Sequence, residues 1–205
     1  MTDRPIVHVV DDDEAMRLAL EGLFDSAGLK THLYEKAKDF LEAELPDTPS
    51  CIVLDVRLPD ANGLEFQAQL TELGVHLPVV MMTGHGDIPM SVRAMKRGAV
   101  DFLTKPFRHE DMLNAVTAAI DRDRKRRSVE AELYKVEQQF RTLTAREKEV
   151  MRLVASGKMN KQVAGELGIS EITVKIHRGS AMRKMHARTL ADLIRMAELL
   201  QSKPA

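Results

Sequence analysis

Short apolar runs rich in β-branched residues recur through the first 120 residues of the chain, and longer amphipathic stretches separate them. This alternation is typical of strands that take turns with helices in an α/β fold. The runs at 51–54 and 79–82 are almost continuously apolar, as strands are when helices cover both faces of a parallel sheet. Five runs, at 6–10, 31–34, 51–54, 79–82 and 101–104, therefore predict a small doubly wound α/β domain.

The remainder of the chain differs in charge and in pattern. Residues 1–120 carry 11 Lys and Arg against 20 Asp and Glu, and residues 121–205 carry 19 against 11, so the formal net charge of −1 hides an acidic part and a basic part. A basic module is suited to a polyanionic partner. After Thr144 no strand pattern appears, and Thr144 with Glu147 forms the T-x-x-E pattern of a capping box that begins a helix. We therefore expect a second domain that is small and all-α.

The connection between the two domains is predicted to be helical, because neither Gly nor Pro occurs between Pro106 and Gly157. We expect the domains at residues 1–122 and 143–205, with the helical linker at 123–142.

Two patterns mark the linker region. The charged run at 121–127 predicts a solvated helix face. Beyond it, five apolar residues recur at spacings of 4, 3, 4 and 3: Val129, Leu133, Val136, Phe140 and Leu143. Such a stripe forms either a short parallel coiled coil or a face that packs on a neighbouring domain, and the sequence leaves both open.

The composition also narrows the cellular setting. Cys51 is the single cysteine, so no internal disulfide can form, and no basic segment followed by an apolar one opens the chain as in a secretory signal. No apolar run approaches the roughly 18 residues that a membrane span requires. These features predict a cytoplasmic protein that makes no contact with a membrane.

Polar side chains follow four of the five predicted strands. Asp11, Asp12 and Asp13 follow the first, Asp55 the third, Thr83 the fourth and Lys105 the fifth. Ligands of open α/β sheets bind at this edge, where the carboxyl ends of the strands meet. Carboxylates there predict a Mg²⁺ or Mn²⁺ site, and a hydroxyl with an ammonium group suits the oxygens of a phosphoryl group. Any one of these residues taken alone can be an ordinary loop or helix-capping residue.

Four segments carry a resemblance to a known family over about residues 5–122. They are VVDDD at 9–13, LDVRLPDANG at 54–63, MTGHGD at 82–87 and FLTKPF at 102–107. With these motifs, in this order and spacing, the segment resembles the receiver domains of two-component response regulators. The resemblance implies a five-stranded parallel sheet in the flavodoxin-like order 2-1-3-4-5.

The resemblance also implies a set of metal ligands and a phosphorylation site. Asp55 would accept a phosphoryl group from the phosphohistidine of a sensor histidine kinase. Asp12, Asp55 and the backbone carbonyl of Arg57 would hold Mg²⁺ directly, and Asp11 would hold it through water. The receiver would catalyse its own phosphoryl transfer and slow dephosphorylation only, so no enzyme in the ordinary sense is expected.

Further roles follow from the same likeness. Lys105 would pair with the phosphoryl group, Thr83 would move to donate a hydrogen bond to it, and Phe102 would turn inward as Thr83 moves. The Lys105–Pro106 peptide bond would be cis. His85, two residues after Thr83, could tune the rate of hydrolysis, although a plain loop residue is the more common role at such a place.

The spacing at residues 160–185 is that of a helix-turn-helix. Ala164 is small where the second helix crosses the first, Gly168 turns the chain, and apolar residues on both sides fill the angle between the helices. The next helix places Val174, Ala181 and Met185 on one side. On another side Lys175, Arg178, Gly179 and Met182 recur at i, i+3, i+4 and i+7, which predicts a basic outward stripe that enters the major groove.

This module resembles the four-helix DNA-binding domain of the LuxR/FixJ type over about residues 142–200. The likeness rests on LTAREKEV at 143–150, NKQVAGELGIS at 160–170 and TVKIH at 173–177. It implies DNA contacts by Lys161, Thr173, Lys175, Ile176, Arg178 and position 179. A longer polar residue is common at position 179 in the family, so Gly179 removes a side-chain contact.

Together the two modules are similar to transcription factors of the FixJ/NarL class, and the linker is most like that of the FixJ and StyR branch. The resemblance implies a regulator that forms a homodimer on phosphorylation and binds double-stranded promoter DNA, with RNA polymerase as a further partner. Two alternatives stay open: a Mg²⁺-dependent aspartyl-phosphate phosphohydrolase, and a receiver whose helical output binds protein or RNA. Such phosphohydrolases typically carry a second carboxylate two residues after the nucleophile, where Arg57 stands.

Overall fold

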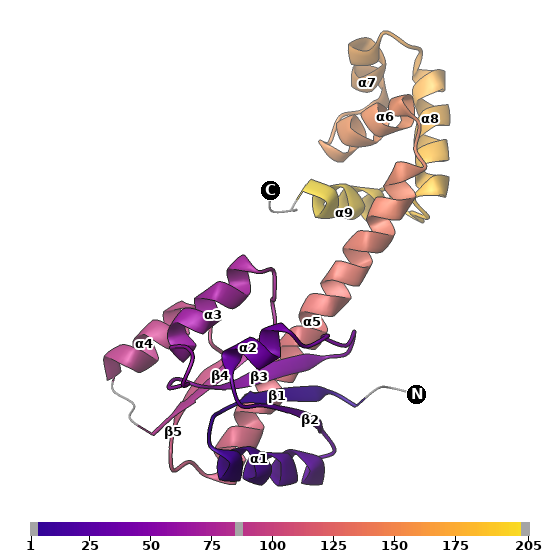
Figure 1. Ribbon diagram of the computed structural model, residues 1–205. Helices are drawn as coiled ribbons and strands as arrows, with labels where there is room; N and C mark the ends of the chain where they lie inside the picture. The colour runs from indigo at the N-terminus through magenta and orange to yellow at the C-terminus, as the bar shows by residue number, and fades with distance from the viewer. Residues whose placement is uncertain (1–3, 85–87, 202–205) are drawn as a thin grey trace. The chain divides into compact units, whose positions relative to one another are not determined.

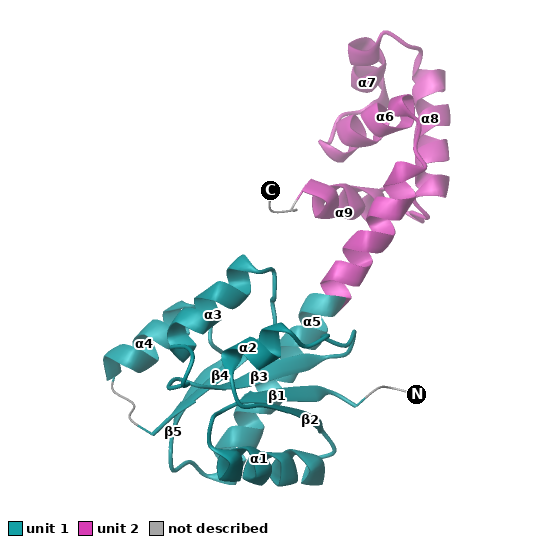
Figure 2. Ribbon diagram, viewed as in Figure 1, with its two compact units in different colours: residues 1–127 teal, residues 128–205 magenta. Residues whose placement is uncertain are grey.

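The computed structural model describes residues 4–84 and 88–201, and these form two compact units. Figure 2 shows unit 1, residues 1–127, and unit 2, residues 128–205, in different colours. Each unit has its own hydrophobic cores and is described separately.

Unit 1 is an α/β fold around a parallel sheet of five strands in the order β2-β1-β3-β4-β5, which confirms the predicted fold class (Figure 1). Its elements are β1 Ile6–Val10, α1 Glu14–Ser26, β2 Lys30–Tyr34, α2 Ala37–Leu41, β3 Ser50–Asp55, α3 Gly63–Glu72, β4 Val79–Thr83, α4 Ile88–Lys96, β5 Asp101–Thr104 and the first part of α5 His109–Arg141. The observed strands match the apolar runs of the sequence to within one residue at each end.

Two cores lie on opposite faces of this sheet. Alternate residues of a strand point to opposite faces, so Val53 packs with α1 and α5, whereas Leu54 packs with α2, α3 and α4. Because helices cover both faces, the central strands β1, β3 and β4 are buried along their whole length. Polar side chains of a site can therefore lie beyond the carboxyl ends of these strands, at one edge of the sheet.

Helix α5 corrects one expectation from the sequence. The charged run at 121–127 was expected to be a solvated face, but the Asp123 side chain is fully buried against the amino end of β3. Its carboxylate accepts the backbone N–H of Ser50 at 2.9 Å and hydrogen bonds from Arg126 and Arg127. Part of the run, Asp123 with Arg126 and Arg127, therefore joins α5 to the amino end of β3, and we call these three residues the Asp123 clamp. Neither α5 nor another helix of the described ranges is long and apolar enough to cross a membrane.

The residues of unit 2 that the structure describes, 128–201, form helices joined by short connections. After the end of α5 the unit comprises α6 Ala145–Ala155, α7 Asn160–Leu167, α8 Glu171–Lys184 and α9 Leu190–Gln201 (Figure 1). The predicted capping box begins α6, because the Thr144 N–H donates to Glu147 at 2.8 Å while the Glu147 N–H donates to the Thr144 hydroxyl. Gly168 ends α7 at φ 65°, a left-handed conformation that suits glycine.

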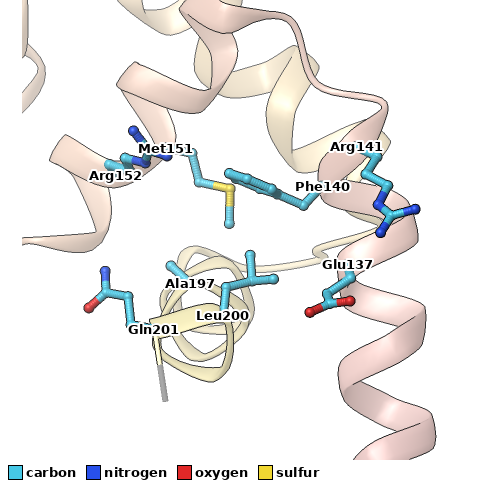
Figure 3. A pocket seen from close by; sticks show the side chains of 8 residues that line it. All are labelled: Glu137, Phe140, Arg141, Met151, Arg152, Ala197, Leu200 and Gln201. Carbon is cyan, nitrogen blue, oxygen red and sulfur yellow. The ribbon is translucent and has the colours of Figure 1, made fainter. Parts of the chain in front are cut away.

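The last three residues of the apolar stripe pack within unit 2, in line with one of the two alternatives left open by the sequence, whereas Val129 at its start is 55% exposed. Val136 and Leu143 are buried with residues of α6, α8 and α9, and Phe140 packs at the edge of this core. Figure 3 shows Phe140 opposite Met151 of α6, with Leu200 of α9 below, around a pocket of about 330 Å³.

Candidate phosphoacceptor site and nucleic-acid interface

Three of the predicted strand-end residues meet at the carboxyl edge of the sheet. The Lys105 ammonium group, just after β5, donates a hydrogen bond of 2.6 Å to Asp11 Oδ2 and a second one to Asp55 Oδ2. The registers of β1 with β3 and of β3 with β4 bring these ends side by side. The backbone N–H of Lys105 also donates to the Thr83 carbonyl at 2.7 Å, so this residue joins the ends of four strands.

The charges of this cluster depend on one another. Burial raises the pKa of Asp11, and the hydrogen bonds from Lys105 and from the Asp13 N–H offset this only in part. Burial alone would lower the pKa of Lys105, but its bonds to Asp11 and Asp55 outweigh burial and raise it. The ammonium group is therefore held in its charged form, as a partner of two carboxylates or of a phosphoryl group must be.

Access to solvent distinguishes the two carboxylates. The Asp55 side chain is 9% exposed, whereas that of Asp11 is 0% exposed. Asp55 Oδ1 accepts the backbone N–H of Arg57 at 2.9 Å, and Oδ2 faces Lys105. Asp55 is therefore the more accessible of these two carboxylates, and the Arg57 N–H fixes its orientation.

Sequence reasoning missed the glycine that shapes the loop after Asp55. The Gly63 N–H donates to the Val56 carbonyl at 2.8 Å, and a Cβ at Gly63 would lie 2.9 Å from the Val56 Cα and closer still to the Asp55 carbonyl oxygen. Any side chain here would push the backbone of Asp55 out of place. The only sign in the sequence is that a glycine begins a helix directly after the capping residue Asn62.

The three consecutive aspartates after β1 have different roles. Asp11 is buried in the cluster, Asp12 is exposed, and Asp13 caps α1 by accepting the backbone N–H groups of Ala15 and Met16. Asp13 thus has the helix-capping role that the sequence left open for any of the three.

The donor set of this edge fits a hard divalent cation. Mg²⁺ usually binds one or two carboxylates and keeps several waters, and Asp11 with Asp55 supplies two carboxylates next to the exposed Asp12. Within the described ranges, no group of three or more His, Cys, Asp or Glu side chains is arranged to hold a metal. The Lys105 ammonium group lies between the two buried carboxylates and neutralises them in this arrangement.

The other predicted receiver residues lie around this cluster. Thr83 is fully buried at the end of β4, and Phe102 is half-buried on β5 against the core on the face covered by α2, α3 and α4. The Lys105–Pro106 bond is cis, as expected. His85 lies outside the described residues.

In unit 2 the predicted helix-turn-helix is formed by α7 and α8. Val163 and Ala164 of α7 pack with Val174 of α8, and Leu167 and Ile169 pack at the edge of the same core. The side of α8 that carries Val174, Ala181 and Met185 is buried, as predicted.

The opposite side of α8 is exposed but less basic than expected. Lys175 and Ile176 are exposed, and Gly179 has nothing within 4 Å of where a Cβ would lie. Met182, predicted on the outward stripe, instead packs against the core that holds Val136 and Leu143. Sequence reasoning did not single out Ile172, which is 71% exposed on the first turn of α8.

The remaining predicted DNA contacts are Lys161 on α7 and Thr173 and Arg178 on α8. Lys161 is exposed on its first turn, and Arg178 is half-buried, with its Nη1 donating to Asn160 Oδ1 at 3.2 Å. The Thr173 hydroxyl is hydrogen-bonded to the capping residue Ser170 at 2.8 Å. Lys161 on α7 and Arg178 on α8 therefore bring two cations to the place where these helices adjoin.

Comparisons with known proteins agree with both parts of this description. Residues 7–117 match the response regulator receiver domain, and residues 141–197 match the bacterial regulatory proteins of the luxR family. The chain is 56% identical over 197 residues to nodulation protein W of Bradyrhizobium diazoefficiens, covering 96% of this chain and 87% of the relative. It is 42% identical to the transcriptional regulatory protein FixJ of Azorhizobium caulinodans, covering 97% and 94%.

Two solved structures are also similar to this chain over nearly its whole length. The structure of the response regulator StyR matches with a TM-score of 0.82 at 45% identity, covering 96% of this chain and 99% of the other. Full-length FixJ from B. japonicum matches with a TM-score of 0.58 at 37% identity, covering 97% and 98%.

Proposed function

Because the chain belongs to the response regulators that join a receiver domain to a LuxR-type DNA-binding domain, we propose that Asp55 is its phosphoacceptor and α8 its DNA-reading helix. The chain is a phosphorylation-activated transcriptional regulator. A response regulator with a DNA-binding output is not a classical enzyme. The observation that carries the site assignment is the meeting of Asp11, Asp55 and Lys105 at one sheet edge, with Asp55 the more exposed carboxylate.

Each residue at this edge of the sheet has its own role in phosphoryl transfer. Asp55 Oδ2 attacks the phosphorus of a phosphohistidine on the sensor kinase, the P–N bond breaks, and the imidazole leaves with the bond electrons. The Arg57 N–H keeps the Asp55 carboxylate oriented. Lys105 then turns from the carboxylates to the phosphoryl oxygens, where its charge stabilises the transition state. Thr83 contributes a hydroxyl donor from the end of β4, and Phe102 changes its packing with it.

Mg²⁺, or Mn²⁺, is the expected cofactor of this step. Receiver domains typically use Mg²⁺. Here Asp11, Asp12, Asp55 and the Arg57 carbonyl would hold it, and when bound it would neutralise negative charge on the phosphoryl oxygens.

Labelling with a radioactive small-molecule phosphodonor and Mg²⁺ tests the site. Wild type is expected to incorporate label, Asp55→Asn to lose it, and the control Asp25→Asn, an exposed carboxylate on α1, to keep it. Equal labelling of Asp55→Asn and wild type would refute the assignment. Steady-state release of phosphate from small phosphoesters, if it is fast, would instead favour the phosphohydrolase alternative.

The DNA-binding assignment rests on the exposed, cation-flanked α8. Lys175→Ala is expected to weaken binding to duplex promoter DNA in a gel-shift assay, because it removes a contact from the exposed side of α8. The control Lys38→Ala, an exposed lysine of unit 1, changes the net charge equally and should not alter affinity. Binding to duplex DNA should fall steeply with salt, and tighter binding to RNA would contradict the proposal.

Dimer formation is proposed at the face next to Phe102. Helix α4 carries Ile88, Val92 and Met95 at i, i+4 and i+7, and all three are exposed. An apolar stripe of this kind on a soluble domain is suited to a second copy. Two linked DNA-binding units then bind two half-sites with a raised effective concentration.

The variant Val92→Asp tests this face. It should keep labelling at Asp55 while abolishing phosphorylation-dependent dimers in sedimentation, and unchanged dimers would place the interface elsewhere. Contact with RNA polymerase stays a prediction.

A further inference from the structure

The outward side of α8 is apolar where a DNA-reading helix usually carries polar groups. Ile172 is 71% exposed and Ile176 is 62% exposed, and Gly179 adds no side chain. At 3.6 residues per turn these three positions lie within an arc of roughly 60°. Val174 and Ala181, both fully buried, lie on the opposite side of the helix. The apolar stripe, meaning Ile172, Ile176 and Gly179, is therefore the part of α8 that points most directly away from unit 2.

Two cations lie beside this stripe, and Arg183, an exposed residue of the last turn, follows the stripe toward the carboxyl end of α8. Lys175 is on one flank of α8, and Arg178 lies further round, where its guanidinium group donates to Asn160 at the start of α7. Lys161 follows on the same turn of α7. Groups in these places are suited to the two phosphate backbones that border a groove, which fix the position of a protein on DNA without reading its sequence.

The chemistry of the major groove limits what the stripe can read. Guanine, cytosine and adenine present hydrogen-bonding groups there, and an aliphatic side chain cannot satisfy these. The C5-methyl group of thymine is the apolar group on the base edges. Ile172 and Gly179 are seven residues apart, which is about 10 Å along the helix or roughly three base pairs. The missing side chain at Gly179 lets the backbone of α8 approach the base edges.

We propose that Ile172 and Ile176 select thymine through contact with its C5-methyl group, so that base readout by this domain is largely apolar. The inference rests on the proposed role of α8 in DNA binding and names the chemical group that α8 recognises. Arg178, held by Asn160, acts on the phosphate backbone instead.

The test uses the full-length chain with phosphodonor and Mg²⁺. Duplexes are first enriched from a random library, and each thymine of the enriched site is then replaced by deoxyuracil, which differs only in lacking the methyl group. Affinity is measured by fluorescence anisotropy at fixed salt. Loss of one contacted methyl should weaken wild-type binding about fourfold, the factor expected for one buried methyl group.

Two single variants test which isoleucine contacts which methyl group. Ile172→Ala and Ile176→Ala should each bind the thymine duplex more weakly, and each should become insensitive to deoxyuracil at one position. Both residues are exposed, so a thermal melt should show both variants folded. The control Leu190→Ala, an exposed residue on α9, should keep the full sensitivity of wild type.

The outcomes separate this inference from the proposed function. Enriched duplexes that bind equally well with thymine and deoxyuracil would overturn thymine readout and leave DNA binding intact. Sensitivity that persists in both isoleucine variants would also overturn it. If no duplex is enriched at all, the DNA-binding proposal and this inference both fail.

Discussion

Replacing Asp123 tests whether the buried clamp of α5 is a main support of unit 1. The Asp123→Ala variant leaves the Ser50 N–H without its acceptor, and an unpaired buried N–H costs about 1–3 kcal/mol. It also removes the carboxylate that Arg126 and Arg127 share, and breaking a buried pair costs about 3–5 kcal/mol, although Arg127 keeps its ion pair with the exposed Asp47. These arginines keep 29% and 25% exposure, so water compensates part of the loss. We expect the free energy of unfolding of unit 1 to fall by about 2–3 kcal/mol.

Native-state hydrogen exchange of the β3 amides in the full chain measures this quantity for unit 1 separately. Asp123→Asn keeps an acceptor for the Ser50 N–H and should lose about half as much. The control Asp121→Ala breaks an exposed pair with Arg124 on the same helix and should cost no more than about 0.5 kcal/mol. If Asp123→Ala costs no more than this control, the reasoning about the clamp is wrong.

The clamp also has a predicted pH dependence. Burial alone would raise the pKa of Asp123, but hydrogen bonds from Arg127, from the Ser50 N–H and from Arg126 outweigh burial and lower it. A carboxylate with a lowered pKa in the folded state stabilises the fold above its ordinary pKa of about 3.9, and this stabilisation disappears as the pH falls through the folded value. The difference between wild type and Asp123→Ala should therefore be constant at neutral pH and shrink below about pH 4.

Three further predictions concern single positions. Gly63→Ala should abolish labelling of Asp55, because its Cβ would collide with the Asp55 backbone, whereas the control Gly22→Ala, with nothing within 4 Å, should keep labelling; equal labelling of the two would contradict this. Gly179→Ala should raise the stability of unit 2 by about 0.5–1 kcal/mol in urea unfolding, since it adds helix propensity without a clash. Burial, with a smaller contribution from a neighbouring histidine, lowers the pKa of His8 to about 4, so unit 1 should lose up to about 3 kcal/mol as the pH falls from about 6.5 to 4. His8→Leu should remove this pH dependence, and a wild-type profile identical to that of the variant would refute it.

Much of the fold could be predicted because the apolar run of each central strand is a local feature of the sequence. The runs that became β3 and β4 are apolar at every position, and only a sheet covered on both faces buries such a run completely. The prediction of a solvated face for the charged run at 121–127 was wrong at Asp123 for a physical reason. Its composition matches a solvated helix, but the burial of Asp123 depends on an N–H at the start of β3, more than 70 residues earlier in the chain, where no local pattern records the pairing.

The candidate site was predictable in its residues and less so in their roles. Parallel strands end at one edge, so Asp11, Asp55 and Lys105 were expected at the same edge once the sheet was assigned, and the long Lys105 side chain reaches past β4 to both carboxylates. The sequence could not tell the buried Asp11 from the helix-capping Asp13, because that distinction depends on which way the chain turns after β1. It also placed Met182 on the outward stripe of α8 and did not single out Ile172, whereas Met182 packs against a core of unit 2 and Ile172 is exposed.

The contacts of Lys105 indicate how phosphorylation can change unit 1 without unfolding it. Its side chain joins Asp11 and Asp55, and its backbone N–H holds the Thr83 carbonyl, so the residue connects β1, β3, β4 and β5. A phosphoryl group on the proposed acceptor Asp55 would draw the ammonium group away from Asp11, and the backbone bond would pass this movement to the ends of β4 and β5. Phe102 and the exposed apolar face of α4 lie at that side of the sheet, whereas the Asp123 clamp lies at the amino end of β3 and is not touched. We therefore infer that the signal leaves the receiver through the α4 and β5 face while the base of α5 stays fixed.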